Sequence, residues 1–277
     1  KIISWSKKRP RKRPRKFYKN NDPCYNLYII IILEEKKMSG IKIIRRNDNN
    51  EQQESVKQLY DKKIEKIISK MPKKLSFEEK VDFLYSFLVN DLGYDYECLE
   101  RTANDTGLVT PTFFADIDDE SVPSTYRGYS NTSDPISAFL HRKALCAATS
   151  KIFKDLCDRA GIKCEICNGK TAIVDDESGI RRGHAWNIVE DEYGRRSHVD
   201  VTYGRFVKDN HEFENCKDRK LEDFSMVSDE DLVKRGPHTF EKSVSRCNYT
   251  VTNHQQIKEK ILSKLNEEEL DTDDIQH

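Results

Sequence analysis

Apolar side chains recur at helical spacing early in the sequence and predict two amphipathic helices. The first occupies residues 51–70 and is ended by Pro72. The second opens at Ser76, whose hydroxyl and the carboxylate of Glu79 have the spacing of a capping box. The side chains expected to face the core are Val56, Leu59, Tyr60, Ile64, Ile67 and Ile68 in the first helix, and Phe77, Val81, Leu84 and Leu88 in the second. Both helices are expected to serve packing alone.

A stretch without clear periodicity follows the second helix. Residues 91–133 are rich in Asp, Ser, Thr and Gly, which predicts a long loop, and loops of this length are usually functional or mobile. Residues 133–135 then cap a short helix that runs through Leu140. Near the end of the chain, residues 255–265 predict a helix and residues 266–274 an acidic, frayed tail.

A further helical pattern begins at Cys146. Its apolar positions are Ile152, Phe153, Leu156 and Ala160. Gly161 stands where a left-handed stop is expected, so Cys146 falls at the N-terminus of the helix. Unpaired N–H groups there favour negative charge and can lower the pKa of a thiol from about 8.5 to roughly 3.5–7.5. Cys146 is therefore a candidate nucleophile, with a small buried core residue as the ordinary alternative.

Two runs rich in β-branched or aromatic residues, 185–189 and 197–202, predict a hairpin with a polar turn centred at Glu192. That register sets His184 opposite Asp200, where Cβ atoms lie about 4.5–5.5 Å apart and a carboxylate can hold an imidazole N–H. A slip of one residue would place the two on opposite faces. In the favourable register His184 is the candidate base for Cys146, and Asp200 fixes its tautomer.

Other side chains near these three have weaker claims. His198 is the rival base, but it lies on the same strand as Asp200, about 6.5–7 Å away, and would pair poorly with it. Trp186 shares the face of His184 and either lines a substrate cleft or belongs to the core. Tyr126 and Tyr129 are speculative substrate contacts, because residues 91–133 directly precede the nucleophile segment and could form a cleft wall. A variable surface excursion is the equal alternative.

Cys164 and Cys167 have the spacing of half a zinc site, but a second pair with suitable spacing is missing from the sequence. They fall on a predicted strand, where their side chains point to opposite faces, so ordinary thiols are expected. Eight cysteines without a signal peptide favour a reducing, cytoplasmic location over a secreted one. No metal and no cofactor are expected.

These segments resemble the core of the transglutaminase-like superfamily of papain-related cysteine enzymes, in its bacterial form. The resemblance is carried by residues 89–95, 146–162, 183–187, 198–202 and 224–230, with His238. It covers roughly residues 76–240. Ala147, Ala148 and Thr149 depart from it, since relatives often place Gly and an aromatic residue after the cysteine. The extra methyl groups could narrow the approach to the thiol.

The resemblance implies a nucleophile at Cys146, a base at His184 and an orienting carboxylate at Asp200. It implies acyl transfer from an amide of a peptide or protein, with water as acceptor in a peptidase or amidase, which bacterial relatives favour. With an amine as acceptor the protein would be a protein-glutamine transglutaminase. A non-catalytic binding module that keeps these residues for structure stays open.

The formal net charge of zero conceals an asymmetry. Residues 1–37 hold 12 Lys or Arg and 3 Asp or Glu, with a basic, proline-containing tract at 7–19. Nucleic-acid binding is one interpretation of this tract, but such tracts also arise without function, and nucleic acid is not the expected partner. The apolar run at 27–33 is too short for a membrane span, which needs about 20 residues.

The four residues before Met38 have purine-rich codons, as a translated ribosome-binding site would. Met38 is therefore the predicted native start, and intact-mass analysis tests this.

Together the patterns predict an α+β fold with a papain/transglutaminase-like core, in which the nucleophile helix packs on an antiparallel sheet. Residues 1–37 are expected to be a disordered or non-native segment and 38–75 a helical lead-in. Residues 76–240 would form the catalytic domain, and 241–277 the C-terminal helix and acidic tail.

Overall fold

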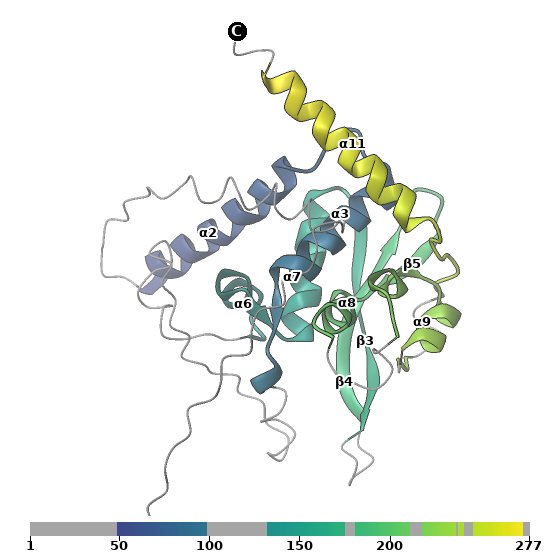
Figure 1. Cartoon of the computed structure of the whole chain (residues 1–277). Coiled ribbons are helices and arrows are strands. Elements are labelled where there is room, and N and C mark those ends of the chain that lie inside the picture. The colour runs from purple at the N-terminus through teal and green to yellow at the C-terminus, as the bar shows by residue number, and fades with distance from the viewer. Residues whose placement is uncertain are drawn as a thin grey trace, which may run out of the picture.

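A four-stranded antiparallel sheet in the order β3-β4-β5-β6 stands at the centre of the protein (Figure 1). The structure is a computed structural model that describes residues 49–98, 132–174, 181–210, 218–236, 238–240 and 246–273. The strands are β3 (Lys163–Val174), β4 (Arg181–Glu190), β5 (Arg196–Val199) and β6 (Ser225–Val227). The mixture of helices with an antiparallel sheet confirms the predicted α+β class.

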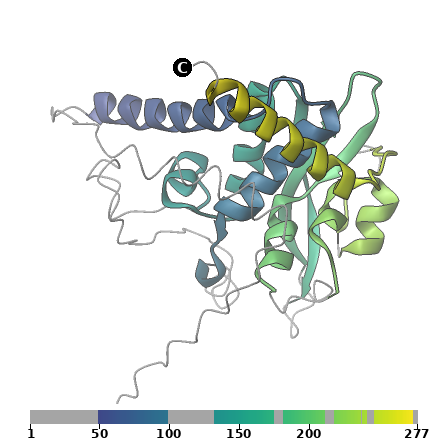
Figure 2. The same cartoon turned by 45° about the horizontal axis from the view of Figure 1, so that its top comes forward.

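Helices surround this sheet. They are α2 (Asn49–Ser69), α3 (Phe77–Asp91), α6 (Pro135–His141), α7 (Cys146–Arg159), α8 (Val201–Lys208), the 3₁₀ helix η1 (Leu221–Phe224), α9 (Asp229–Arg235) and α11 (His254–Asp273). Figures 1 and 2 both show α11, in yellow, lying across the end of α3. Helices α2 and α11 contribute buried side chains to the same hydrophobic cluster as α3 and α7.

The predicted starts of α3, α6 and α7 and the predicted end of α7 are confirmed. At α3, the Ser76 hydroxyl accepts from the Glu79 N–H while the Glu79 carboxylate accepts from the Ser76 N–H. Asp134 caps α6 in the same way through the N–H of Ser137. Helix α7 begins at Cys146, and after it the chain turns at Gly161, whose φ of 71° is left-handed. These local signals therefore fix where the helix that carries Cys146 starts and ends.

Both faces of the sheet are covered, because successive side chains of a strand point to opposite sides. On β4, Val189 packs into the cluster shared with α7, whereas Trp186 and Ile188 pack with the aromatic side chains of α8 and with α9. On β3, Cys164 and Cys167 divide between the same two clusters, as their spacing predicted. Both are buried free thiols.

Three expectations about boundaries are wrong. Gly93 and Tyr94 form a short strand, β1, which pairs in parallel with β2 (Lys143–Ala144), because backbone partners lie fifty residues apart and leave no local pattern. The second strand of the hairpin ends at Val199, and the residues after Asp200 are helical. Helix α11 continues through the acidic residues to Asp273 instead of fraying after residue 265.

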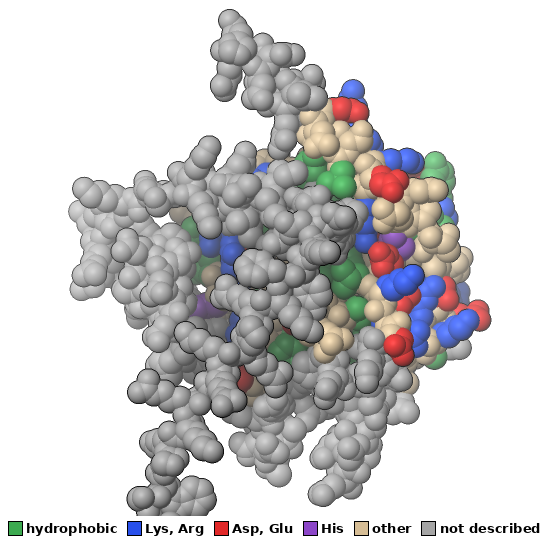
Figure 3. Space-filling model, in the orientation of Figure 1, with side chains coloured by type: hydrophobic (Ala, Val, Ile, Leu, Met, Phe, Trp, Pro, Cys, Tyr) green, Lys and Arg blue, Asp and Glu red, His purple; other side chains and the backbone are tan. Residues whose placement is uncertain are grey.

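Charged side chains of both signs lie side by side on the coloured part of the face in Figure 3. Nucleic-acid binding usually requires a stripe of one sign, which this part of the surface does not present. None of the described helices combines the length and the apolar character that crossing a bilayer requires.

Candidate active site

Cys146 is the first residue of α7, and the chain before it is fixed on both sides. Its neighbour Leu145 has extended dihedral angles and supplies no side-chain cap to the helix. The Leu145 N–H donates to the carbonyl of Thr132 at 2.7 Å, and β2 is held by its pairing with β1. The thiol is therefore presented at a helix N-terminus whose partial positive charge favours its ionised form.

His184 and Asp200 come together through a register other than the predicted one. In β4 and β5, Asn187 pairs with Val199, so the turn is centred one residue later than expected and Trp186 falls in line with Asp200. Direct opposition of His184 and Asp200 is thus wrong, but the displacement is two residues and keeps them on the same face. The Nε2–H of His184 donates to Oδ2 of Asp200 at 2.7 Å.

Asp200 owes its position to a change of secondary structure. It follows the end of β5 and is the N-cap of α8, where its Oδ1 accepts from the N–H of Tyr203 at 3.0 Å. This cap leaves Oδ2 for the histidine. Because the carboxylate is 1% exposed, it has little competition from water.

The His184 side chain and the N–H of Ala185 lie close enough to the Cys146 sulfur to stabilise its thiolate. Since Nε2 of His184 faces Asp200, the other ring nitrogen, Nδ1, is the one available to the sulfur. Burial alone would raise the pKa of Cys146, but the hydrogen bond and charge of His184 and the Ala185 N–H outweigh burial and lower it. The geometry therefore favours a thiolate.

The pKa of the His184 imidazole is shifted in the direction that complements the lowered pKa of Cys146. Burial lowers the pKa of His184, but the charge and hydrogen bond of Asp200, followed by the contact with Cys146, raise it to about 10. Burial likewise opposes ionisation of Asp200, yet the charge and hydrogen bond of His184 hold its pKa well below the usual range. A thiolate, an imidazolium and a carboxylate in series are thus the protonation states that the site favours at neutral pH.

Trp186 and His198 lie behind the imidazole. The ring of Trp186 stacks on His184 at a centroid distance of 5.5 Å and is 1% exposed, which gives it the place of a supporting side chain rather than an open cleft wall. Its indole N–H donates to Nδ1 of His198 at 2.9 Å, and Nε2 of His198 donates to Asp229 at 2.8 Å. His198 is thereby directed away from the Cys146 thiol.

His238 is a buried part of the same site. It is 1% exposed, and its Nε2 lies 2.8 Å from the same Asp200 Oδ2 that binds His184. No periodic pattern surrounds it in the sequence; the one available signal was its place in the family resemblance. The other expected contacts, Tyr126 and Tyr129, lie outside the described residues, as does most of the predicted loop.

Two groups of side chains among the described residues could offer three ligand atoms to a metal ion. One is His184, Asp200 and His238; the other is His198, Asp229 and Cys247. In the second group the indole N–H occupies Nδ1 of His198, so its proton is on Nε2 and that nitrogen has no lone pair for a metal. In the first, both histidines already donate to one carboxylate oxygen.

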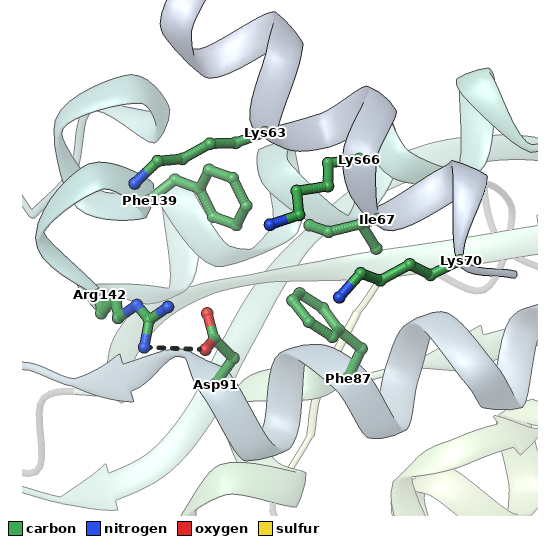
Figure 4. A pocket seen from close by; sticks show the side chains of 8 residues that line it. All are labelled: Lys63, Lys66, Ile67, Lys70, Phe87, Asp91, Phe139 and Arg142. Carbon is green, nitrogen blue, oxygen red and sulfur yellow. Dashed lines mark ion pairs between the residues drawn. The ribbon is translucent and has the colours of Figure 1, made fainter. Parts of the chain in front are cut away.

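A hollow of about 30 Å³ lies apart from these groups and includes none of the three predicted catalytic residues. Figure 4 shows it between α2, α3 and the segment after α6. It is lined by Lys63, Lys66, Ile67, Lys70, Phe87, Asp91, Phe139 and Arg142. Arg142 pairs with Asp91 at 3.4 Å. With four basic side chains against one acidic one, this hollow would repel a metal cation.

No family model matches the sequence, and no curated protein matches it either. A solved structure described as "Crystal structure of a TGase" is similar over 62% of this chain, with 18% sequence identity and a TM-score of 0.38. The match spans 36% of that structure's own chain. At this level of similarity the comparison adds nothing about chemistry, so any function must be argued from the site itself.

Proposed function

We propose that this protein is a cysteine-dependent acyl-transfer enzyme that cleaves an amide bond of a peptide or protein. One observation carries the proposal: the sulfur of Cys146 stands at the start of α7 between the N–H of Ala185 and the imidazole of His184, which Asp200 holds from behind. These are the partners that a nucleophilic thiolate requires.

The proposed reaction begins with attack of the Cys146 thiolate on the amide carbonyl carbon. The carbonyl oxygen gains negative charge, which N–H groups at the helix start can stabilise. His184 then gives its proton to the leaving nitrogen as the C–N bond breaks, and a thioester remains on Cys146. His184, now neutral, takes a proton from water, and the hydroxide equivalent displaces the thiolate to release a carboxylic acid.

Asp200 supports both halves of this cycle without reacting. Its hydrogen bond fixes the proton on Nε2 of His184 and directs Nδ1 at the sulfur. Its negative charge stabilises the imidazolium that is present before the first proton transfer and that forms again in the second. Hydrolysis and transamidation share every step up to the thioester. We propose water as the acceptor, and a primary amine in its place would make the same site a transglutaminase.

The test is mass spectrometry of a glutamine-containing peptide library incubated with the protein, with and without a primary amine. Backbone cleavage, glutamine deamidation and amine incorporation give three distinct mass changes, so the experiment separates peptidase, amidase and transglutaminase activities. We expect cleavage or deamidation that disappears in Cys146→Ala and persists in Cys247→Ala, a control that removes a different buried thiol. A library left unchanged by the wild-type protein would contradict the proposal and favour a binding module.

A further inference from the structure

The carboxylate of Asp200 receives a second imidazole that the reaction above does not use. Nε2 of His238 lies 2.8 Å from Oδ2, which His184 approaches to 2.7 Å, while Oδ1 accepts from the N–H of Tyr203. Both imidazoles and the carboxylate are at least 93% buried. A carboxylate cannot donate, so each histidine must present an Nε2–H to the shared oxygen.

The surroundings of His238 fix its tautomer. Its Nδ1 is buried and has no hydrogen-bond partner among the described residues. That edge of the ring lies against Gly236, where an added Cβ would come within 2.6 Å of Nδ1. A second proton on the ring would create a buried N–H with no acceptor among the described residues, which is costly. Burial also lowers the pKa of His238, so the ring remains neutral while it donates.

Two sets of contacts keep His238 in place. The next residue, Thr239, exchanges two backbone hydrogen bonds of 2.8 Å with Lys170 of β3, so the segment lies along the sheet like a short extra strand. The ring packs on Tyr203 at a centroid distance of 4.5 Å and edge-on to Trp186 at 5.2 Å. This segment is therefore positioned by the sheet, independently of α8, which carries the cap formed by Asp200.

We propose that His238 is a positioning residue for the candidate triad: a permanently neutral donor that keeps Asp200 ionised and aimed at His184. The inference rests on the proposed function for its biological meaning, but its physical content concerns protonation alone. Without the donor, Asp200 loses one of its hydrogen bonds and holds the imidazolium less firmly. The thiolate of Cys146 then loses part of its stabilisation, and its pKa rises.

Two variants separate hydrogen bonding from packing. His238→Gln can place an amide N–H where Nε2–H lies, whereas His238→Met fills similar space and offers no donor. The readout is the pH dependence of iodoacetamide labelling at Cys146, followed by peptide mass mapping. A hydrogen bond to a charged group is worth about one pKa unit or more. We therefore expect the pH at which labelling of Cys146 falls to half its maximum to rise by ~1 unit in the Met variant and to stay near the wild-type value in the Gln variant.

A second measurement needs no substitution. Nitrogen-15 chemical shifts of the wild-type protein report which ring nitrogen carries the proton, and we expect His238 to keep a protonated Nε2 and a bare Nδ1 across neutral pH. A His238 that titrates as a cation near pH 6.5, or equal labelling profiles for the Met variant and the wild type, would overturn the inference. If Cys146 labels no faster than other cysteines, it is the proposed function that fails, whatever the tautomer of His238.

Discussion

The protein contains two groups of Cys, His and Asp that are alike in composition and opposite in charge state. In one, Cys146 faces His184; in the other, Cys247 lies with His198 beside Asp229. The pKa of His184 is raised to about 10, whereas that of His198 is lowered to about 4. The thiols differ in the same sense, with a lowered pKa for Cys146 and a strongly raised one for Cys247.

The difference comes from what faces each group rather than from its residue types. The imidazole of His198 is buried, and the indole N–H of Trp186 points at its Nδ1, so another proton there would oppose the indole proton. The thiol of Cys247 is also buried and lies beside the carboxylate of Asp229, while the imidazole near it, that of His198, is neutral, so the thiolate is disfavoured. A nucleophilic thiol thus requires a position at a helix start and a cationic partner. Of Cys146 and Cys247, only Cys146 has both.

The largest test of this comparison removes one thiol at a time. Cys146→Ala is expected to reduce amide turnover by roughly 10⁵-fold, because the attacking atom is lost, while Cys247→Ala should leave it nearly unchanged. The activity of each variant is measured as turnover of the most reactive library peptide. The reactivity of each thiol is measured by iodoacetamide labelling at pH 6, mapped by mass spectrometry. Labelling of Cys247 as fast as Cys146 would remove the distinction between the two groups.

The two carboxylates provide the next test. Asp200→Asn is expected to lower turnover by about 10⁴-fold, since an amide cannot stabilise the imidazolium and can present its NH₂ to His184. Asp229→Asn makes the same chemical change beside a histidine that is already neutral. Its expected effect is on the free energy of unfolding, measured by urea denaturation, with turnover changed only a few-fold. Similar losses of turnover in both variants would mean that the group around Asp229 also contributes to catalysis.

Stability should depend on pH in opposite directions for the two histidines. His184 has a raised folded pKa, so its contribution is complete below about 6.5 and is lost as pH rises through about 10. His198 has a lowered folded pKa, so the unfolded state gains a proton first and stability falls between pH 6.5 and about 4, by up to ~3 kcal/mol.

Urea denaturation over pH 4–10 checks both slopes. His184→Asn should flatten the alkaline fall and leave the acid fall, whereas His198→Gln should do the reverse. Each variant serves as the control for the other, because the remaining titrating groups are common to both. An alkaline fall that survives in His184→Asn would show that His184 is not the group that loses its proton there.

Sequence patterns predicted the parts of this site that depend on local rules. The capping box at Ser76, the cap at Asp134 and the glycine stop at Gly161 each act within a few residues, and together they locate the helix that starts at Cys146. The hairpin was also predicted, although its register was displaced by two residues, because loop composition does not fix which residues pair.

The parts that sequence patterns missed depend on long-range pairing or on competing propensities. His238 is buried because Thr239 pairs with Lys170, 69 positions earlier, and a lone histidine carries no periodic signal in the sequence. The residues after Asp200 are β-prone in composition, yet Asp200 caps a helix, so a strand was expected where α8 begins. Long-range pairing decided the first outcome, and a local helix cap decided the second.

The smallest expected effect concerns Trp186, the side chain that connects the two groups. Trp186→Phe keeps a ring stacked on His184 but removes the N–H that donates to His198. The pKa of His198 should then rise from about 4 toward its ordinary value, and the free energy of unfolding at pH 7 should fall by about 1–3 kcal/mol, because Nδ1 is left unsatisfied.

Turnover should change only a few-fold, since the contacts of His184 with Cys146 and Asp200 remain. Histidine NMR titration beside urea denaturation checks the pair of changes. A large loss of turnover with the pKa of His198 unmoved would mean that Trp186 acts on the imidazole of His184 directly and that the second group is not defined by its indole donor.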